Sequence, residues 1–244
     1  MEREKINQTI KHELDFRITN NMTGFSGDIK PSAVLDIFQT VAESHVEKLG
    51  LSVDFLLSEG YAWVLQSVKY EKVGCVKSGQ IVKAVTYPLK PRGVFYDREY
   101  FLSDENGNTL VKGSSRWVII NLSSRKIELG RRFSYPSEIF VQDGVFENRT
   151  EVGRLRPNRE NMSFVGELLI GKSMIDRLSH MNNTRYADVV CEFFPFDFKS
   201  LAVEYVKEIR EGETVSVYAA QTPCGAILTG EVESERRFVA RFEL

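Results

Sequence analysis

The stretch that decides the fold is PSAVLDIFQTVAESHVEKL, residues 31–49. Its apolar residues recur every three or four positions, which is the spacing of one face of a helix. They are Val34, Ile37, Phe38, Val41, Ala42 and Leu49. Pro31 suits the first turn of a helix, and Gly50 is placed to end it. We therefore predict a helix over these residues, with one face buried.

On both sides of this helix the apolar residues change to a spacing of two, which is typical of strands. Such runs include Leu14, Phe16 and Ile18 before the helix and Val94, Tyr96, Tyr100 and Leu102 after it. Residues 104–108, DENGN, separate the later run from another over 110–121. Because Asn-Gly between two strand-like runs favours a tight turn, we predict a hairpin there.

The second half of the chain repeats this order. A strand-like run over 164–170 precedes a helix whose face is marked by Tyr186, Val189, Val190 and Phe193, and Pro195 ends it. Four further runs follow, over 201–209, 214–221, 225–233 and 237–244, with the last turn predicted at 233–236. The segment VEYV at 203–206 echoes VKYE at 68–71. This order indicates an internal duplication.

The domain organisation follows from the duplication. Each half is predicted to be a long antiparallel sheet wrapped around one helix, which is an α+β class with two tandem domains. We place the domains at residues 1–125 and 159–244, with a linker over 126–158 that contains many basic residues.

Composition limits the functional classes. The chain has 244 residues, of which 42% are hydrophobic and 27% charged, and this is typical of a globular protein. Its net charge of −2 provides no basic field for nucleic acid. Apolar runs such as 117–120 are far shorter than the roughly 20 residues of a spanning helix, and the charged start MEREK leads into no signal sequence. We predict a cytoplasmic protein, from a bacterial cell, with no membrane span and no nucleic-acid partner.

Two kinds of site are disfavoured by what the sequence lacks. Cys75, Cys191 and Cys224 are an odd number without the spacing of a disulfide framework or a zinc site, so we predict reduced thiols, no metal and no cofactor. The sequence also lacks GxSxG, GxxxxGK[ST], HExxH and a GxGxxG after a strand. Several large enzyme classes are thereby excluded.

One dense polar cluster remains, DRLSHMNNTRY at residues 176–186. Asn182 or Asn183 can cap the second helix, whose N-terminal N–H groups then suit an oxyanion. His180 can exchange a proton with a substrate, and Asp176 can fix its tautomer or orient a water. These residue types fit acyl transfer to water. In the structural alternative, Asn182 only caps, His180 packs in a loop and Asp176 makes a turn.

This cluster resembles the D-x-N-x-H-V-N-N-x-x-Y signature of plant-type and bacterial acyl-ACP thioesterases. The similarity extends to EYVKE at 204–208, where the family has E-Y-R-R-E-C, and to SRWV at 115–118. The resemblance implies two tandem hotdog domains, the first forming the acyl pocket and the second carrying the catalysis. It implies an enzyme of fatty acid biosynthesis that hydrolyses fatty acyl-ACP to free fatty acid and carrier protein.

Residue by residue, the resemblance places Asp176, His180 and Glu208 at active-site positions. Two positions depart from the family pattern, because Leu178 replaces an Asn and Ile209 replaces a Cys found in many plant members. Ile209 therefore argues against a thiol nucleophile at that place. We predict a water made nucleophilic beside Glu208 or Asp176, with His180 assisting proton transfer or holding the thioester. Direct attack by a carboxylate stays open.

The first half is predicted to lack a second pair of this kind. Asp28 lies at about the counterpart of His180, and Val73 lies near the counterpart of Glu208. The acyl-pocket candidates are Val34, Phe38 and Val41, each of which also fits an ordinary core residue.

The partner implied by the resemblance is the acyl carrier protein, which is acidic. Candidates for docking it are basic residues of the linker region, namely Arg125, Lys126, Arg131 and Arg132. Two alternative functions remain, an acyl-CoA thioesterase and a catalytically silent acyl-binding hotdog protein, the latter favoured by Leu178. Association into a homodimer is a further expectation.

Overall fold

The computed structural model describes residues 11–128, 155–195 and 197–244. Within these ranges, the first half contains two helices and five strands, namely β1 (His12–Arg17), α2 (Pro31–Lys48), α3 (Val53–Ser58), β2 (Tyr61–Lys72), β3 (Ile81–Pro88), β4 (Tyr96–Ser103) and β5 (Thr109–Asn121). The second half contains β6 (Ser163–Leu169), the 3₁₀ turn η5 (Asn183–Arg185), α4 (Tyr186–Phe193), β7 (Ser200–Tyr205), β8 (Thr214–Thr222), β9 (Gly225–Val232) and β10 (Glu235–Glu243). Short 3₁₀ turns also lie at Asn20–Met22, Arg159–Asn161 and Lys172–Met174.

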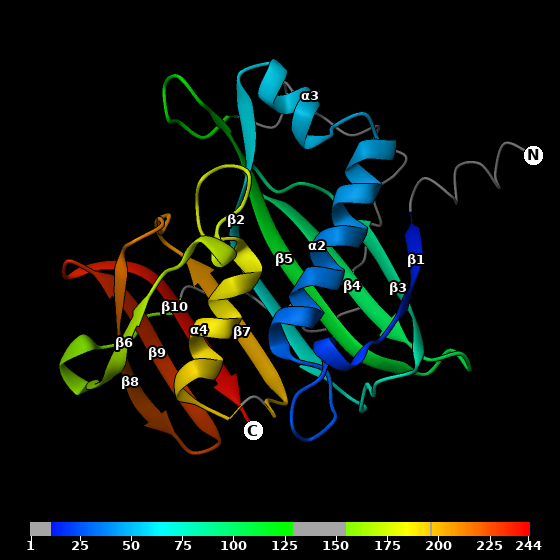
Figure 1. The fold of residues 1–244 in the computed structure, drawn as a ribbon. Coiled ribbons are helices and arrows are strands. Elements are labelled where there is room, and N and C mark those ends of the chain that lie inside the picture. The colour runs from blue at the N-terminus through cyan, green and yellow to red at the C-terminus, as the bar shows by residue number, and fades with distance from the viewer. Residues whose placement is uncertain (1–10, 129–154, 196) are drawn as a thin grey trace, which may run out of the picture.

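The strands form one antiparallel sheet in the order β1-β3-β4-β5-β2-β7-β10-β9-β8-β6. Five neighbouring strands come from each half, and the halves join where β2 pairs with β7. Figure 1 shows α2 lying across the strands of the first half and α4 across those of the second. The predicted α+β class is confirmed. The structure differs from the prediction in two details, because the first half has a second, short helix, α3, and the two halves share one continuous sheet.

Helix α2 has the extent that its periodicity predicts. Pro31 opens it, and Gly50, just beyond its end, has a left-handed φ of 74°. Phe38 stacks on Tyr100 of β4, with 4.4 Å between ring centroids. Gly113 of β5 is required there, because a Cβ at this position would lie 2.2 Å from the Phe38 ring. The buried face of α2 therefore packs against the first half of the sheet.

The junction of the two halves has a local twofold axis. The N–H groups of Val73 and Val206 donate to the carbonyls of Leu110 and Arg237, which marks Val73 and Val206 as equivalent. Counted back along the strands, Lys69 of β2 and Ala202 of β7 are then equivalent, and they lie directly opposite each other in the antiparallel pair. The duplicated halves therefore face each other across the centre of one continuous sheet. The sequence echo between 68–71 and 203–206 is two residues out of this register.

Two boundaries in the second half differ from the prediction. Strand β7 leaves the sheet after Tyr205, because the following chain turns away and the carbonyl of Ile209 accepts a hydrogen bond from Met181 N–H at 2.7 Å. The last turn is shorter than predicted, since only Glu233 and Ser234 adopt left-handed φ values, 51° and 63°. Two such residues match the twist of a tight hairpin, so β10 begins at once.

Within the described ranges, no helix is both long enough and apolar enough to span a bilayer.

Candidate active site

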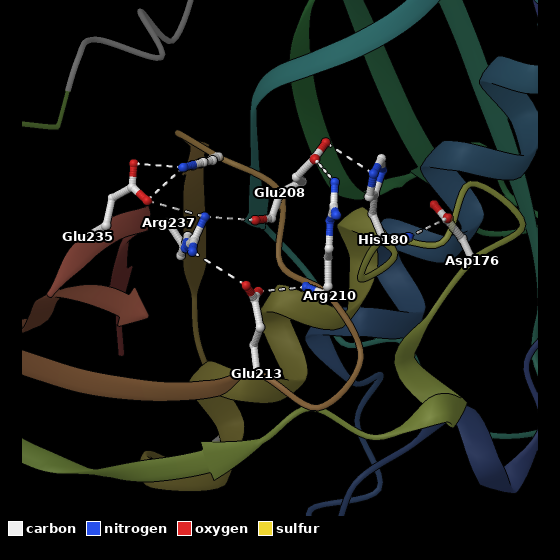
Figure 2. A network of polar contacts seen from close by, with 8 residues as sticks. Asp176, His180, Glu208, Arg210, Glu213, Glu235 and Arg237 are labelled. Atoms are coloured by element: carbon white, nitrogen blue, oxygen red, sulfur yellow. Dashed lines mark hydrogen bonds and ion pairs between the residues drawn. The ribbon is translucent and has the colours of Figure 1, made fainter. Parts of the chain in front are cut away.

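His180 of the polar cluster meets Glu208, which is distant in the sequence, in the second half. His180 lies in the loop before η5, and Glu208 lies in the loop over 206–213 that joins β7 to β8. His180 Nε2 is 3.1 Å from Glu208 Oε2, and the two side chains are 32% and 31% exposed. Figure 2 shows them pointing toward each other. The structure thus brings together two of the three residues that the resemblance places in the active site.

Glu208 is held as a carboxylate by its surroundings. Its Oε1 accepts a hydrogen bond from Arg210 at 2.7 Å. Burial raises the pKa of Glu208, but the hydrogen bond from Arg210 and the electrostatic interactions with His180, Arg210 and Arg125 outweigh it, so the pKa is lowered overall. Glu208 is therefore ionised at neutral pH, with one oxygen toward Arg210 and the other toward His180.

The contacts of Asp176 are with the backbone of its own loop. Its Oδ1 accepts hydrogen bonds from the backbone N–H groups of Leu178, at 2.7 Å, and His180, at 3.4 Å. Its own N–H donates to the carbonyl of His180 at 2.8 Å. These contacts close a turn in which Ser179 has a left-handed φ of 64°. Asp176 thus shapes the loop through the His180 backbone, as the structural alternative expects.

Asn182 caps the 3₁₀ turn η5, which continues directly into α4, so it caps the helical part of the second half as predicted. Its Oδ1 accepts hydrogen bonds from the N–H and the hydroxyl of Thr184, both at 2.9 Å. The carbonyl of Asn183 accepts a hydrogen bond from the Tyr205 hydroxyl at 2.8 Å. The N-terminus of η5 and α4 is therefore fixed beside the His180 loop from two sides.

A cavity of about 620 Å³ lies between the first half and this loop. Trp63, Tyr96 and Trp117 contribute aromatic walls, while Asp176, Leu178, Asn182 and Asn183 contribute the side that belongs to the second half. Helix α2 faces the cavity with residues that include Gln39, Ala42, Glu43 and Val46. The acyl-pocket candidates Val34, Phe38 and Val41 lie instead in the core, each at most 2% exposed, and none of them lines the cavity.

Two of the four docking candidates can be located. Arg125 and Lys126 are exposed, and the charge of Arg125 acts on Glu208. Arg131 and Arg132 lie outside the described residues. The prediction missed Arg210, whose only sequence signal is its position two residues after Glu208.

The thiols and the acidic side chains offer little else. Cys75 and Cys224 are exposed, and burial raises the pKa of the Cys191 thiol to about 12. Within the described part of the chain, no group of three or more His, Cys, Asp or Glu side chains is arranged to hold a metal ion.

The first half has a counterpart of the active-site loop, built on the same backbone contacts. Met181 N–H donates to the carbonyl of Ile209 at 2.7 Å, and Ile29 N–H donates to the carbonyl of Val76 at 2.9 Å. Residues before these match as well, so Asp28 is the counterpart of His180, as predicted. The counterpart of Glu208 is Cys75, because Glu208 directly precedes Ile209 and Cys75 directly precedes Val76, whose carbonyls accept these two hydrogen bonds. It lies two residues beyond the expected Val73.

Comparisons with known proteins agree with this architecture. Two family models match, the acyl-ACP thioesterase N-terminal domain over residues 9–129 and the acyl-ACP thioesterase C-terminal domain over residues 160–243. A search of curated proteins finds no match.

Several solved structures are similar along nearly the whole chain. An acyl-ACP thioesterase from Bacteroides thetaiotaomicron is 19% identical, with 97% of this chain and 98% of that chain covered and a TM-score of 0.84. The 12:0-ACP thioesterase from Umbellularia californica is 17% identical, with 96% of each chain covered and a TM-score of 0.84. A putative oleoyl thioesterase from Lactobacillus plantarum is 19% identical, with 96% and 95% covered and a TM-score of 0.78. These likenesses confirm the predicted tandem of two hotdog domains.

Proposed function

Because the chain belongs to the acyl-ACP thioesterase family, we propose that His180 and Glu208 carry out its hydrolysis of fatty acyl-ACP. The observation that carries this assignment is the 3.1 Å contact between His180 Nε2 and Glu208 Oε2. The contact lies beside a cavity that is lined by close sequence neighbours of His180. A nucleophilic water, an acyl chain and a proton acceptor can therefore meet at one place.

The two side chains have different roles in this proposal. A glutamate whose pKa is lowered is a weaker proton acceptor than an ordinary one, so we assign the proton to the imidazole of His180. Glu208 accepts the hydrogen bond of His180 Nε2–H, which leaves Nδ1 as the acceptor. Glu208 thus orients the ring and stabilises its positive charge once the proton has been taken.

The reaction then needs no covalent enzyme intermediate. The oxygen of water attacks the thioester carbonyl carbon while His180 takes a proton from that water. When the tetrahedral intermediate collapses, the carbon–sulfur bond breaks and the leaving thiolate of the carrier takes the proton back from His180. The products are the free fatty acid and the carrier thiol.

The oxyanion is assigned to the first turn of η5. The N–H of Thr184 already donates to Asn182 Oδ1, and the N–H of Arg185 already donates to the carbonyl of Asn182. We therefore assign the N–H of Asn183 as the donor to the thioester oxygen, supported by the positive end of the helical segment. Both asparagines line the cavity, and this supports a donor near a bound acyl group.

The cavity of the first half is the proposed acyl site. Its volume of about 620 Å³ lies within the usual range of small-molecule pockets, and aromatic walls at Trp63 and Trp117 suit an apolar chain. The residues of α2 that we assign to this site are Ala42 and Val46, which replace Val34, Phe38 and Val41 as candidates. Each half thus contributes one part of the site, the first the pocket and the second the chemistry.

Carrier docking is proposed at the basic residues beside Glu208. Arg125 is close enough for its charge to lower the pKa of Glu208, and Lys126 is exposed next to it. An acidic carrier bound there would present its thioester to His180. A homodimer and a cytoplasmic location stay predictions.

Hydrolysis of an acyl-ACP chain-length series, compared with the same acyl-CoAs, tests the proposed substrate. We expect kcat/KM for the best acyl-ACP to exceed that for the matching acyl-CoA at least about 10-fold, because the acidic surface of a protein carrier makes a larger contact with the basic residues than the phosphates of CoA do. Equal or higher values with acyl-CoA would favour the acyl-CoA alternative. Acyl binding without any hydrolysis would favour the silent binder that Leu178 raises.

A further inference from the structure

Arg237 is a buried cation behind Glu208 that the proposed mechanism does not use. It lies on β10 and its side chain is 8% exposed. In the pairing of β10 with β9, Arg236 lies opposite Glu231 and Phe238 opposite Gly230, so Arg237 is the extra residue of a β-bulge. A bulge redirects a side chain away from the regular alternation of a strand. Here it directs the guanidinium toward the loop that carries Glu208.

The guanidinium group of Arg237 contacts this loop at several points. One nitrogen donates to the backbone carbonyl of Glu208 at 3.3 Å, and the other lies 3.5 Å from Glu213 Oε1. The second oxygen of Glu213 accepts the N–H of Arg210 at 2.7 Å. Figure 2 shows Arg237 in the middle of this network. The backbone on both sides of the Glu208 carboxylate is therefore tied to one side chain.

Glu235 extends the network to the start of the same loop. Its Oε2 lies 3.6 Å from Arg237, and its Oε2 and Oε1 accept hydrogen bonds from Lys207 Nζ at 2.7 and 2.9 Å. Lys207 immediately precedes Glu208 in the chain. Arg237 thus connects carboxylates that hold residues before and after Glu208.

The first half provides an internal control for this position. The carbonyl of Arg237 accepts the N–H groups of Val206 and Lys207 at 2.8 and 3.0 Å. The carbonyl of Leu110 accepts those of Val73 and Gly74 at 2.9 and 3.0 Å in the same way. Leu110 is also skipped in the pairing of β4 with β5, where Leu102 lies opposite Val111 and Ser103 opposite Thr109. The fold therefore accepts an apolar side chain at this bulge.

Burying the guanidinium group of Arg237 also costs folding free energy. Among the described residues, Arg237 Nε is buried without a hydrogen-bond partner. Burying a charged group with an unsatisfied donor lowers stability, and leucine would avoid that penalty. A side chain that the fold does not need, and that carries such a penalty, is explained by what it holds in place.

We propose that Arg237 is a positioning residue that holds the Glu208 loop so that the carboxylate stays within hydrogen-bond reach of His180. This inference rests on the proposed function of that pair. The matching loop of the first half carries Cys75 in place of Glu208, and there leucine suffices. Displacements of about 1 Å in a catalytic group can lower the rate by about 100-fold, so a loosened loop reduces turnover even though the fold persists.

The test compares Arg237→Leu, which copies the first half, with Arg237→Lys, which keeps the charge but loses the planar fork. Arg241→Leu is the matched control, since Arg241 is an exposed arginine on the same strand that contacts Glu243. We expect Arg237→Leu to fold with a Tm no lower than that of the wild type and a KM for acyl-ACP within about 2-fold, while kcat falls roughly 10-fold to 100-fold. Arg237→Lys should fall in between, and Arg241→Leu should match the wild type.

A second set of variants separates positioning from other roles. In the Glu208→Gln background, adding Arg237→Leu should lower kcat by less than about 2-fold, since the carboxylate being positioned is already gone. An equal kcat loss in both backgrounds, or wild-type kcat in either Arg237 variant, would overturn the inference. If Arg237→Leu does not fold, the Lys variant carries the same comparison. Normal turnover by Glu208→Gln alone would instead overturn the proposed function.

Discussion

The loops over 24–30 and 176–182 are built alike, and only the second takes part in the catalysis that we propose. Gly24 N–H donates to the carbonyl of Asp28 at 2.9 Å, and Asp176 N–H donates to the carbonyl of His180 at 2.8 Å. Each loop then leads into the helix that lies across its half of the sheet. The backbone frame is therefore shared, and the side chains placed on it differ.

In the first half the frame is closed by a buried ion pair. Asp28 Oδ2 is 2.6 Å from Lys72 Nζ, both side chains are nearly buried, and Asp28 Oδ1 accepts the N–H of Val76 at 2.8 Å. In the second half, the His180 and Glu208 side chains remain one third exposed. The same loop backbone can therefore carry side chains with different roles. In the first half, the carboxylate of Asp28 is fully used in holding the structure together, whereas in the second half a pair that is one third exposed stays accessible for the proposed chemistry.

The largest expected effect separates the two counterpart positions directly. Glu208→Gln should retain acyl binding and lower kcat at least about 100-fold, because the imidazole loses its orienting carboxylate. Cys75→Ser, at the matching position of the first half, should leave kcat unchanged. Steady-state hydrolysis of acyl-ACP measures both. A comparable loss in the two variants would remove the distinction between the halves.

Asp28→Asn should show the opposite pattern, with stability lost and chemistry kept. Removing one charge leaves Lys72 buried beside an amide, which we expect to lower the free energy of unfolding by about 2 kcal/mol. Urea titration measures this, with kcat per folded molecule as the second readout. Lys83, an exposed residue that pairs with Glu13, provides the control variant Lys83→Gln. A selective loss of kcat in Asp28→Asn would show that the first loop takes part in catalysis.

The same pair predicts how stability depends on pH. Burial raises the pKa of Asp28, but hydrogen bonds from Lys72 and the backbone and the Lys72 charge outweigh it and lower the pKa. A lowered carboxyl pKa contributes stability above the unfolded value of about 4, and this is lost as the pH falls through the folded pKa. Wild type should therefore lose more stability than Asp28→Asn on acidification below about pH 4. Parallel urea midpoints would contradict the ion pair.

A smaller effect on activity is expected at Arg125 and Lys126, basic residues that follow the last strand of the first half and lie near Glu208. Reversing Arg125 and Lys126 to glutamate should raise KM for acyl-ACP roughly 10-fold, because an acidic carrier is repelled. Small thioester substrates should be nearly unaffected, and added salt should reduce the difference between variant and wild type. Equal changes with both kinds of substrate would rule out docking at these residues.

The smallest effect concerns the thiols, which lie in both halves. Replacing Cys75, Cys191 and Cys224 with serine should leave kcat within about 2-fold, because the buried Cys191 thiol, with its pKa raised to about 12, is protonated at neutral pH. The new hydroxyl at position 191 should lower stability by about 1 kcal/mol. Loss of activity in a folded triple variant would mean that a thiol participates.

The sequence was sufficient where one period dominated. Helix α2 has a clear apolar face, and the Asn-Gly hairpin and the strands of the second half follow from turn residues and alternation. β2 was recognised only through its echo at 68–71. It lies at the centre of the sheet, where neither parity of its residues is consistently exposed, so alternation is lost.

The candidate site was predictable only in part, for a similar reason. His180 and Asn182 belong to one dense segment, and family resemblance added Glu208. The turn contacts of Asp176 depend on the left-handed backbone conformation of Ser179, which the local sequence does not indicate. Arg237 carries no motif at all, and only the folded bulge brings it beneath Glu208. Contacts between distant strands are what the sequence pattern could not supply.

Acyl-ACP hydrolysis by His180→Ala, Glu208→Gln and the double variant tests the proposed pair most directly. If the two residues act as one unit on one transition state, each single change should lower kcat at least about 100-fold, and the double change should cost far less than the product of the two losses. A loss in the double variant equal to that product would contradict the account. So would near-normal turnover by Glu208→Gln together with its abolition by Asp176→Asn, which would move the chemistry to Asp176.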